Sequence, residues 1–379
     1  MTLIPFPPRG ELLTRLEFAT VVLQTYEGEQ RLSRRASPRL GVSMSFELFG
    51  DEIEEARTLG RRIAESAGVI ALPDWRYARQ IAVTAGQTTF DVGDVAALYE
   101  VGGAVIIWQA PRDFVSATVT AVNAPTVTVS AGPAVAMPSA RVAPVWSGVS
   151  SDGLAISPEG YGFAIGTLNA TLFGYPDLSA TAVPLSYESE EFFDGLRIRG
   201  ADLTDTVERA HTIVDNGQGP IEAVPDQNYT AGRLTLSLEE ESTDAIFARE
   251  AFFHRRRGRA KPFFVSSDTN DFEPIGGVGG PDITIPDSIT PAEITGLRLN
   301  LTQTDGTETP TTVLGAVDNL DGTLTATVSP NLPAASESEI ATLSELALVR
   351  LDADAIEFRT SFDGVTRIGV PLWRVDYEL

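Results

Sequence analysis

The chain has 379 residues, of which 43% are hydrophobic and 21% are charged, and it contains no cysteine. This composition is typical of a soluble globular protein with more than one domain. The missing cysteine excludes disulfides, thiolate nucleophiles and cysteine-ligated zinc sites. The 52 acidic residues outnumber the 28 Lys and Arg and give a net charge of −24. A dedicated nucleic-acid binder usually carries a basic face, so this balance argues against one.

No window approaches the roughly 18 consecutive apolar residues that span a bilayer, so we expect no membrane segment. The first residues, MTLIPFPPRGELL, lack a basic region followed by a sustained apolar run. We therefore expect no signal peptide at this end of the sequence.

The first 76 residues predict extended segments followed by one helix over 50–68. In that helix Ile53, Ala56, Leu59 and Ile63 share one face, and acidic residues at its start favour the helix dipole. The run GVIALPDW follows this helix.

Residues 77–145 predict only strands, because β-branched residues alternate with small polar ones, as at Val115, Ala117 and Val119. We expect a small inserted β-barrel here. Residues 146–175 then end in a hairpin, LAISPEGYGFAIGTLNATL.

The second half follows the same order, which indicates a tandem duplication. Strands precede a helix that Ser242 caps and Gly258 ends, and a second all-strand stretch precedes a last hairpin, IEFRTSFDGVTRIGVPLWRV. The spacing from Leu48 to Pro73 is 25 positions, and from Leu238 to Pro262 it is 24. Prolines and the acidic run Glu188, Glu190 and Glu191 mark 176–200 as a connector.

The predicted fold class is therefore mainly β with a few helices (α+β), built from two β-sandwich modules that each contain one helix and one inserted small β-barrel. The predicted domains are 1–76 with 146–175, the insert 77–145, the connector 176–200, 201–268 with 351–379, and the insert 269–350.

Residues that could carry chemistry are few. His211 and His254, the two histidines, lack metal-ligand spacing. Gly276–Gly280 lacks the lysine and the following helix of a phosphate loop, and Asp318–Gly322 predicts a hairpin turn better than a calcium loop. The acid pairs Glu54/Glu55 and Glu188/Glu190 lie where solvated charge is expected. We expect no enzyme activity, catalytic residue, metal or cofactor.

Cations gather at two places in this acidic chain, one in each half. A helix end tolerates cations, so the dipole explains part of the second group. The cations that the dipole does not explain suggest docking surfaces for a neighbouring subunit. The candidate contacts are Arg31, Arg34, Arg35, Arg39, Arg255, Arg256, Arg257 and Arg259.

The run from Leu16 to Leu40, the helix after it and the LPDW segment resemble distal tail and minor tail proteins of long-tailed, siphovirus-type bacteriophages. The positions that carry the resemblance are Gly28, Glu29, Arg31, Arg34, Arg35, Pro38, Arg39, Pro73 and Trp75. The second copy departs from the pattern: Gly217 and Pro220 remain, but IEAVPDQNY replaces the arginines. Its RRRGRAKPFF resembles a basic, aromatic segment of the same proteins.

The resemblance implies that the two β-sandwich modules are tail-tube-like. It further implies a structural ring protein of the virion tail tip, between the tail tube protein and the hub and fibre proteins, with DNA passing through without specific binding. Closed rings use heterologous interfaces, so two tandem modules favour a trimer with pseudo-six-fold symmetry over a hexamer. The alternative is a carbohydrate- or host-surface-binding module carried by the inserts, with Tyr99, Trp108 and Trp146 as sugar platforms or, more simply, as core residues. A cell-wall hydrolase finds no residues to carry it.

Overall fold

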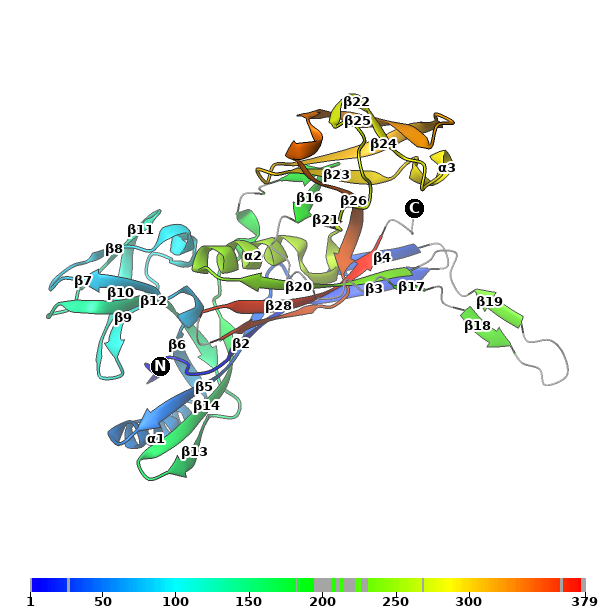
Figure 1. Ribbon diagram of the computed structural model, residues 1–379. Helices are drawn as coiled ribbons and strands as arrows, with labels where there is room; N and C mark the ends of the chain where they lie inside the picture. The colour runs from blue at the N-terminus through cyan, green and yellow to red at the C-terminus, as the bar shows by residue number, and fades with distance from the viewer. Residues whose placement is uncertain are drawn as a thin grey trace.

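A computed structural model describes residues 2–25, 28–181, 183, 185–193, 206–208, 211–214, 222–225, 231–267, 269–361 and 364–375. The chain is mainly β with a few helices, as the sequence predicts. Figure 1 shows one long sheet through the middle of the molecule, with a lobe at one end and a second lobe above it.

The central sheet joins eight antiparallel strands in the order β13–β14–β5–β2–β27–β28–β20–β17. The first-half strands are β2 (Leu12–Glu17), β5 (Arg39–Phe49), β13 (Leu154–Gly160) and β14 (Phe163–Phe173). The second-half strands are β17 (Thr206–Glu208), β20 (Ala231–Glu240), β27 (Ala355–Thr360) and β28 (Thr366–Arg374). Both predicted closing hairpins are therefore confirmed.

A smaller group of strands lies beside this sheet in each half, with the same pairings. In the first half β1 (Thr2–Leu3) runs parallel to β6 (Val69–Pro73), which pairs with β12 (Met137–Val149). In the second half β16 (Glu190–Phe193) runs parallel to β21 (Phe263–Ser266), which pairs with β26 (Ile340–Leu351). The strands β12 and β26 then pair with β14 and β28.

Outside the inserts, the remaining described strands of the two halves form two further hairpins and one short ladder. The hairpins are β3 (Thr20–Thr25) with β4 (Gly28–Ser33), and β18 (His211–Val214) with β19 (Glu222–Pro225). The short ladder joins β15 (Ser186–Tyr187) to β16. Each hairpin falls between equivalent strands of its half.

Each half has one long helix, close to the predicted ranges. Helix α1 (Asp51–Glu65) buries Ala56, Leu59 and Ile63 and carries acids in its first turn. Helix α2 (Thr243–Arg256) begins at Ser242, whose hydroxyl accepts a hydrogen bond from the Ala245 amide at 3.1 Å. It ends because Arg257 and Gly258 both take the left-handed conformation.

The first insert follows a short 3₁₀ helix, η1 (Trp75–Tyr77), and the second follows β21. The first contains β7 (Arg79–Val83), β8 (Thr89–Asp91), η2 (Gly93–Leu98), β9 (Ala104–Ala110), β10 (Asp113–Asn123) and β11 (Thr126–Val129). The second contains β22 (Val278–Pro286), α3 (Pro291–Ile294), β23 (Arg298–Gln303), β24 (Glu308–Asp318), β25 (Thr323–Ala335) and η5 (Glu337–Glu339).

The strand order is β7–β12–β9–β10–β11–β8 in the first insert and β22–β25–β24–β23–β26 in the second. The described ladders do not join the outer strands, so barrel closure stays a prediction. The strand β12 runs from the first insert into the core without a break across residue 145, and β26 reaches the core in the same way. Each insert is therefore bound to its half by a continuous strand.

The two halves share one hydrophobic core, while the second insert has its own. One cluster includes residues of α1, of α2 and of the inner face of the central sheet. A separate cluster fills the second insert around Leu299, Leu301 and Leu324. Among the described residues, the side chains on the opposite face of the central sheet are mostly exposed or half-buried, so the inserts and helices leave that face uncovered.

Matched ladders in the two halves are filled by different pairs of side chains. In the first half Gly166 lies opposite Phe46, and in the second Ile368 lies opposite Leu238. A phenylalanine facing a glycine fills about the same space between two strands as a leucine facing an isoleucine. A Cβ on Gly166 would overlap the Phe46 ring, which is itself stacked on Phe6 with centroids 5.2 Å apart.

We therefore expect Gly166→Ala to lower the free energy of unfolding by about 1–3 kcal/mol, because the buried ring cannot move aside without strain. Gly369→Ala is the matched control: it lies in β28, and its added Cβ would meet no atom within 4 Å. Urea unfolding of the two variants measures the difference. Equal losses would contradict the packing argument.

Candidate assembly edges and the seam between the halves

The two halves are joined strand to strand within the central sheet. Strand β2 of the first half pairs antiparallel with β27 of the second over six residues, from Leu12 opposite Thr360 to Glu17 opposite Ala355. A ladder of this length fixes the register of one half against the other, because a one-residue slip would turn every side chain to the wrong face.

The same pairings leave one strand of each half at the two ends of the sheet. The ladders place β13 beside β14 as β27 lies beside β28, and β17 beside β20 as β2 lies beside β5. Val207 lies opposite Gly232 at the position where Leu16 lies opposite Leu40. The outer strands β13 and β17 are thus the equivalents of the two strands that join inside the chain.

A cluster of charged side chains is buried where the halves meet. Arg76 of η1 binds both carboxylate oxygens of Asp74, at 2.9 and 2.7 Å, and an oxygen of Glu250 in α2 at 3.0 Å. Its guanidinium also donates to Thr14 and to Tyr175, each at 3.3 Å. The Tyr77 hydroxyl donates to the same Glu250 oxygen. Arg76 therefore ties together residues of the first half, the segment after β14 and helix α2 of the second half.

Electrostatics inside this cluster outweighs the effect of burial. Burial alone would raise the pKa of Glu250, but Arg76, with His254 and Tyr77, lowers it to about 2. Burial would also lower the pKa of Arg76, yet Asp74 and Glu250 raise it well above its usual value. Glu250 and Arg76 are therefore held as an ion pair in the core.

His254 belongs to the same cluster and binds the segment after the first half. Its Nδ1 accepts a hydrogen bond from the Leu178 amide at 3.2 Å, which places the proton of the neutral ring on Nε2. That Nε2 faces Oε1 of Glu250 at 3.9 Å. The histidine is buried and links two segments of the chain, and the side chain of His211 lies outside the described residues.

Arg255 and Arg256 do not form an outward docking surface, and this prediction is wrong. Both side chains are buried, and both bind Glu191 of β16: Arg255 Nε lies 2.9 Å from Oε1, and Arg256 Nη2 lies 2.5 Å from Oε2. Glu191, expected to be a solvated connector residue, is buried as well because β16 is part of the second-half fold. The arginines attach this strand to α2.

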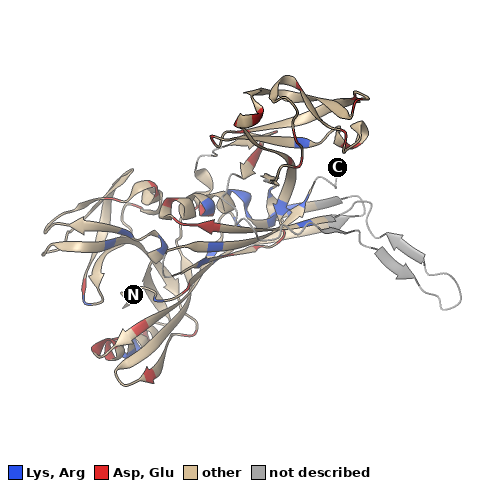
Figure 2. Cartoon of the chain, in the orientation of Figure 1, with Lys and Arg blue, Asp and Glu red and all other residues tan. Residues whose placement is uncertain are grey.

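A contact inside the chain joins the two predicted arginine groups. The Arg31 guanidinium donates to the carbonyl of Arg259 at 3.4 Å, and Arg259 pairs with Asp352 at 3.4 Å. Nearby, Asp354 accepts hydrogen bonds from the Thr20 amide at 2.8 Å and hydroxyl at 2.7 Å. Figure 2 shows cations gathered around α2 and the strands beside it.

The remaining arginines of the prediction differ in exposure. Arg35 donates to the Glu17 carbonyl at 3.2 Å, and Arg257 is half-buried at the end of α2. Arg34 and Arg39 are exposed, so contact with a neighbour stays a prediction for these two.

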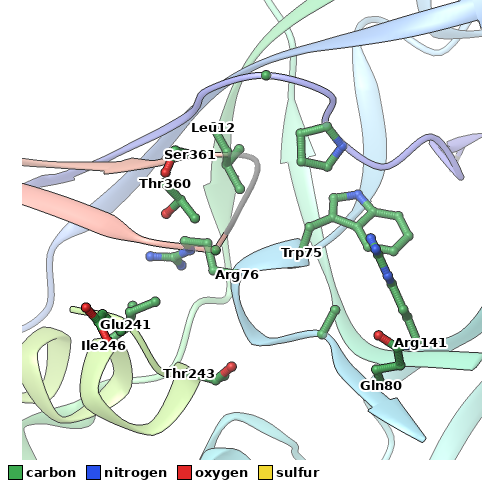
Figure 3. A pocket seen from close by; sticks show the side chains of 14 residues that line it. Leu12, Trp75, Arg76, Gln80, Arg141, Glu241, Thr243, Ile246, Thr360 and Ser361 are labelled. Carbon is green, nitrogen blue, oxygen red and sulfur yellow. The ribbon is translucent and has the colours of Figure 1, made fainter. Parts of the chain in front are cut away.

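A pocket of about 300 Å³ opens along the same seam (Figure 3). Leu12, Trp75 and Ile246 form its apolar wall, while Gln80, Arg141 and Glu241 bring polar groups from both halves. The lining contains no histidine, so its serine and threonine hydroxyls have no imidazole base beside them.

The aromatic residues considered as sugar platforms are mostly core. Tyr99 and Trp146 are buried in the main hydrophobic cluster. Trp108 is partly exposed, but it packs edge-on against Trp75 at 5.6 Å, and the Arg141 guanidinium lies 5.7 Å from its ring. A sugar platform built from all three rings is therefore absent from the described first insert.

The other sequence features take structural places. Gly276–Gly280 leads into strand β22 rather than a helix, and Asp318–Gly322 forms the turn between β24 and β25. Glu54 pairs with Arg57, and Glu188 binds Arg298 at 2.9 Å. Within the described residues, no three His, Asp or Glu side chains are grouped to hold a metal ion, and no helix there is long and apolar enough to cross a bilayer.

The Arg76–Glu250 cluster was not predicted from the sequence, although the spacing of residues on helix α2 indicates a buried carboxylate. Ile246, Glu250 and His254 follow one another at four-residue steps on a helix that also carries Phe247, Phe252 and Phe253. A lone carboxylate on an apolar helix stripe needs a buried cation, because an unpaired buried charge is costly.

No model of a known protein family matches the chain, and no curated protein matches it.

Proposed function

We propose that the chain is a structural subunit of a ring, and that the ring belongs to the tail tip of a long-tailed bacteriophage. There it would link the hollow tail tube to the hub and host-recognition proteins and form part of the DNA conduit. The phage assignment is supported by the sequence resemblance of residues 16–75, and the ring by the strand order of the central sheet.

One observation carries the ring: the chain already contains the contact that would repeat between chains. Strand β2 pairs with β27 inside the chain, and their equivalents β17 and β13 lie at the two ends of the sheet. If the halves arose by duplication, the same contact between chains joins β17 of one subunit to β13 of the next. Such a contact is heterologous, and it closes into a ring when the rotation per step permits.

The proposed copy number rests on the predicted duplication. Each chain supplies two equivalent sheet units, so three chains supply six. We therefore propose a trimer with pseudo-six-fold symmetry, which would match a six-fold tube to a three-fold hub. On the outer edge Pro158 lacks an amide donor and Glu159 adds charge, features that limit indiscriminate pairing of an edge strand.

A cysteine cross-link tests the edge contact against a clean background, since the chain has no cysteine. Matching the ladders residue by residue places Thr206 of one chain opposite Ala155 of the next, as Arg15 lies opposite Glu357 inside the chain. The Thr206→Cys/Ala155→Cys variant should form disulfide-linked closed oligomers under mild oxidation, seen on non-reducing gels.

The chain provides its own control. Arg15→Cys/Glu357→Cys should cross-link within the chain and leave the mass unchanged. Each single variant, Thr206→Cys or Ala155→Cys, should give no ladder of oligomers. If the edge pair stays monomeric while the internal pair oxidises fully, the proposed contact is wrong.

A further inference from the structure

The uncovered face of the central sheet combines small residues with arginines, glutamates and a few apolar side chains such as Leu13. Two shallow hollows of about 260 and 450 Å³ lie on it, one over each half. Gly41 and Ser43 floor the first, and Ser237 and Gly369 floor the second. In a ring joined through the strand edges, the helices and inserts would fit on the outside, which would leave this bare face toward the channel.

Charge on this face is balanced, unlike charge on the whole chain. Its arginines stand beside carboxylates: Arg15 lies 3.4 Å from Glu17, Arg359 lies 3.2 Å from Glu357, and Arg367 lies 3.6 Å from Glu239. At its borders Arg9 pairs with Glu47 at 3.2 Å and Arg233 with Asp352 at 3.7 Å, and Arg39 lies opposite Glu17 in the ladder. The negative excess lies elsewhere: residues 269–350 contain twelve Asp and Glu against two Arg.

The stability of the fold does not explain these pairs. Across the three central pairs the side chains are between 31% and 70% exposed. Ion pairs this exposed contribute about 0–1 kcal/mol, because water and salt screen them. Arginine alone at these sites would bind phosphate and release counterions, whereas an arginine already paired with a carboxylate has little counterion to release.

We propose that the four glutamates Glu17, Glu47, Glu239 and Glu357 mask the arginines of this face, so that duplex DNA slides along it without being retained. The inference rests on the proposed conduit function and names the surface that meets the DNA. Small hydroxyl side chains and paired charges make the face wettable and electrostatically neutral at short range. Fields of opposite charges a few Å apart cancel within the roughly 8 Å Debye length of physiological salt.

The test removes the carboxylates and asks whether the face gains affinity. The variant Glu17→Gln/Glu47→Gln/Glu239→Gln/Glu357→Gln is titrated, as the full chain, against a labelled 30-base-pair duplex, a length of about three helical turns. We expect wild type not to bind at 50 mM salt and the variant to bind. Arg359 keeps a second carboxylate, Glu11, at 3.8 Å. With Arg9, Arg15 and Arg367 released, the variant's affinity should fall on the order of 40-fold between 50 and 200 mM salt.

The matched control changes net charge equally at exposed sites off this face: Glu65→Gln/Glu100→Gln/Glu241→Gln/Glu273→Gln. It should bind no better than wild type. The masking role would be overturned if both variants gained the same affinity for the duplex, or if the variant of Glu17, Glu47, Glu239 and Glu357 gained none. The assay does not need assembled rings, so a negative result here leaves the cross-linking result intact, and a failed cross-link leaves this result intact.

Discussion

Replacing Arg76 by alanine should lower the free energy of unfolding by about 3–5 kcal/mol. The side chain is fully buried between Asp74 and Glu250, which its removal would leave as two buried negative charges without a cation. Thr14 and Tyr175 would lose a hydrogen-bond donor as well. Chemical denaturation followed by tryptophan fluorescence measures the loss.

Two further variants separate the loss of charge balance from the loss of packing. Arg57→Ala removes an exposed arginine paired with Glu54 and should change stability by no more than about 0.5 kcal/mol. The triple variant Asp74→Asn/Arg76→Met/Glu250→Gln removes all three charges and should recover most of the stability. If Arg76→Ala cost less than about 1 kcal/mol, or if the triple variant were no better, the buried ion pairs would not be what holds the seam.

The stability of the chain should also depend on Glu250 in acid. Its pKa in the folded chain is about 2, below the value near 4.3 of an unfolded chain. A lowered folded pKa contributes stability that is present above about pH 4.3 and is lost as the pH falls toward 2. Over that window the contribution is about 3 kcal/mol.

Glu250→Gln cannot lose this contribution, so the gap in unfolding free energy between wild type and variant should narrow from pH 5 to pH 3. Denaturant titrations at several pH values measure the gap. Thr14→Val is the control from the same cluster: it removes a bond to Arg76 but no titrating group, so its gap should stay constant. If the difference in unfolding free energy between wild type and Glu250→Gln did not change with pH, this would contradict the ion pair between Glu250 and Arg76.

The elements that local patterns determine could be predicted from the sequence. Apolar spacing and the Ser242 cap place α2 correctly, because helix stripes and caps depend on neighbours within a few residues. The closing hairpins follow from alternation and turn residues in the same way. The order of elements in the second half also repeats that of the first.

The sequence could not show which distant residues pair. Nothing near Leu16 indicates that it lies opposite Ile356, since both strands carry the same alternating pattern as other strands of the chain. The burial of Arg255 was missed for a related reason. A helix end explains a cation locally, and only the parallel pairing of β16 with β21 brings Glu191 to it.

The assignment of the buried charges also required the fold. Asp74 and Arg76 are neighbours in sequence, but Glu250 comes from the other half of the chain. From the sequence alone, an arginine two positions after an aspartate indicates a surface ion pair. In the structure, helix α2 of the second half covers this pair. The proposed assembly edges are hidden from the sequence in the same way, because they depend on which strands of the described part of the sheet are paired on one side only.

A reconstruction of the assembled ring from electron-microscope images, at a resolution that separates strands, tests the central claim most directly. We expect three chains around the ring, with β17 of each chain beside β13 of the next and six equivalent sheet units facing the channel. A ring of six chains would contradict the proposed copy number. A ring in which β13 and β17 do not meet would contradict the account of how the subunits join.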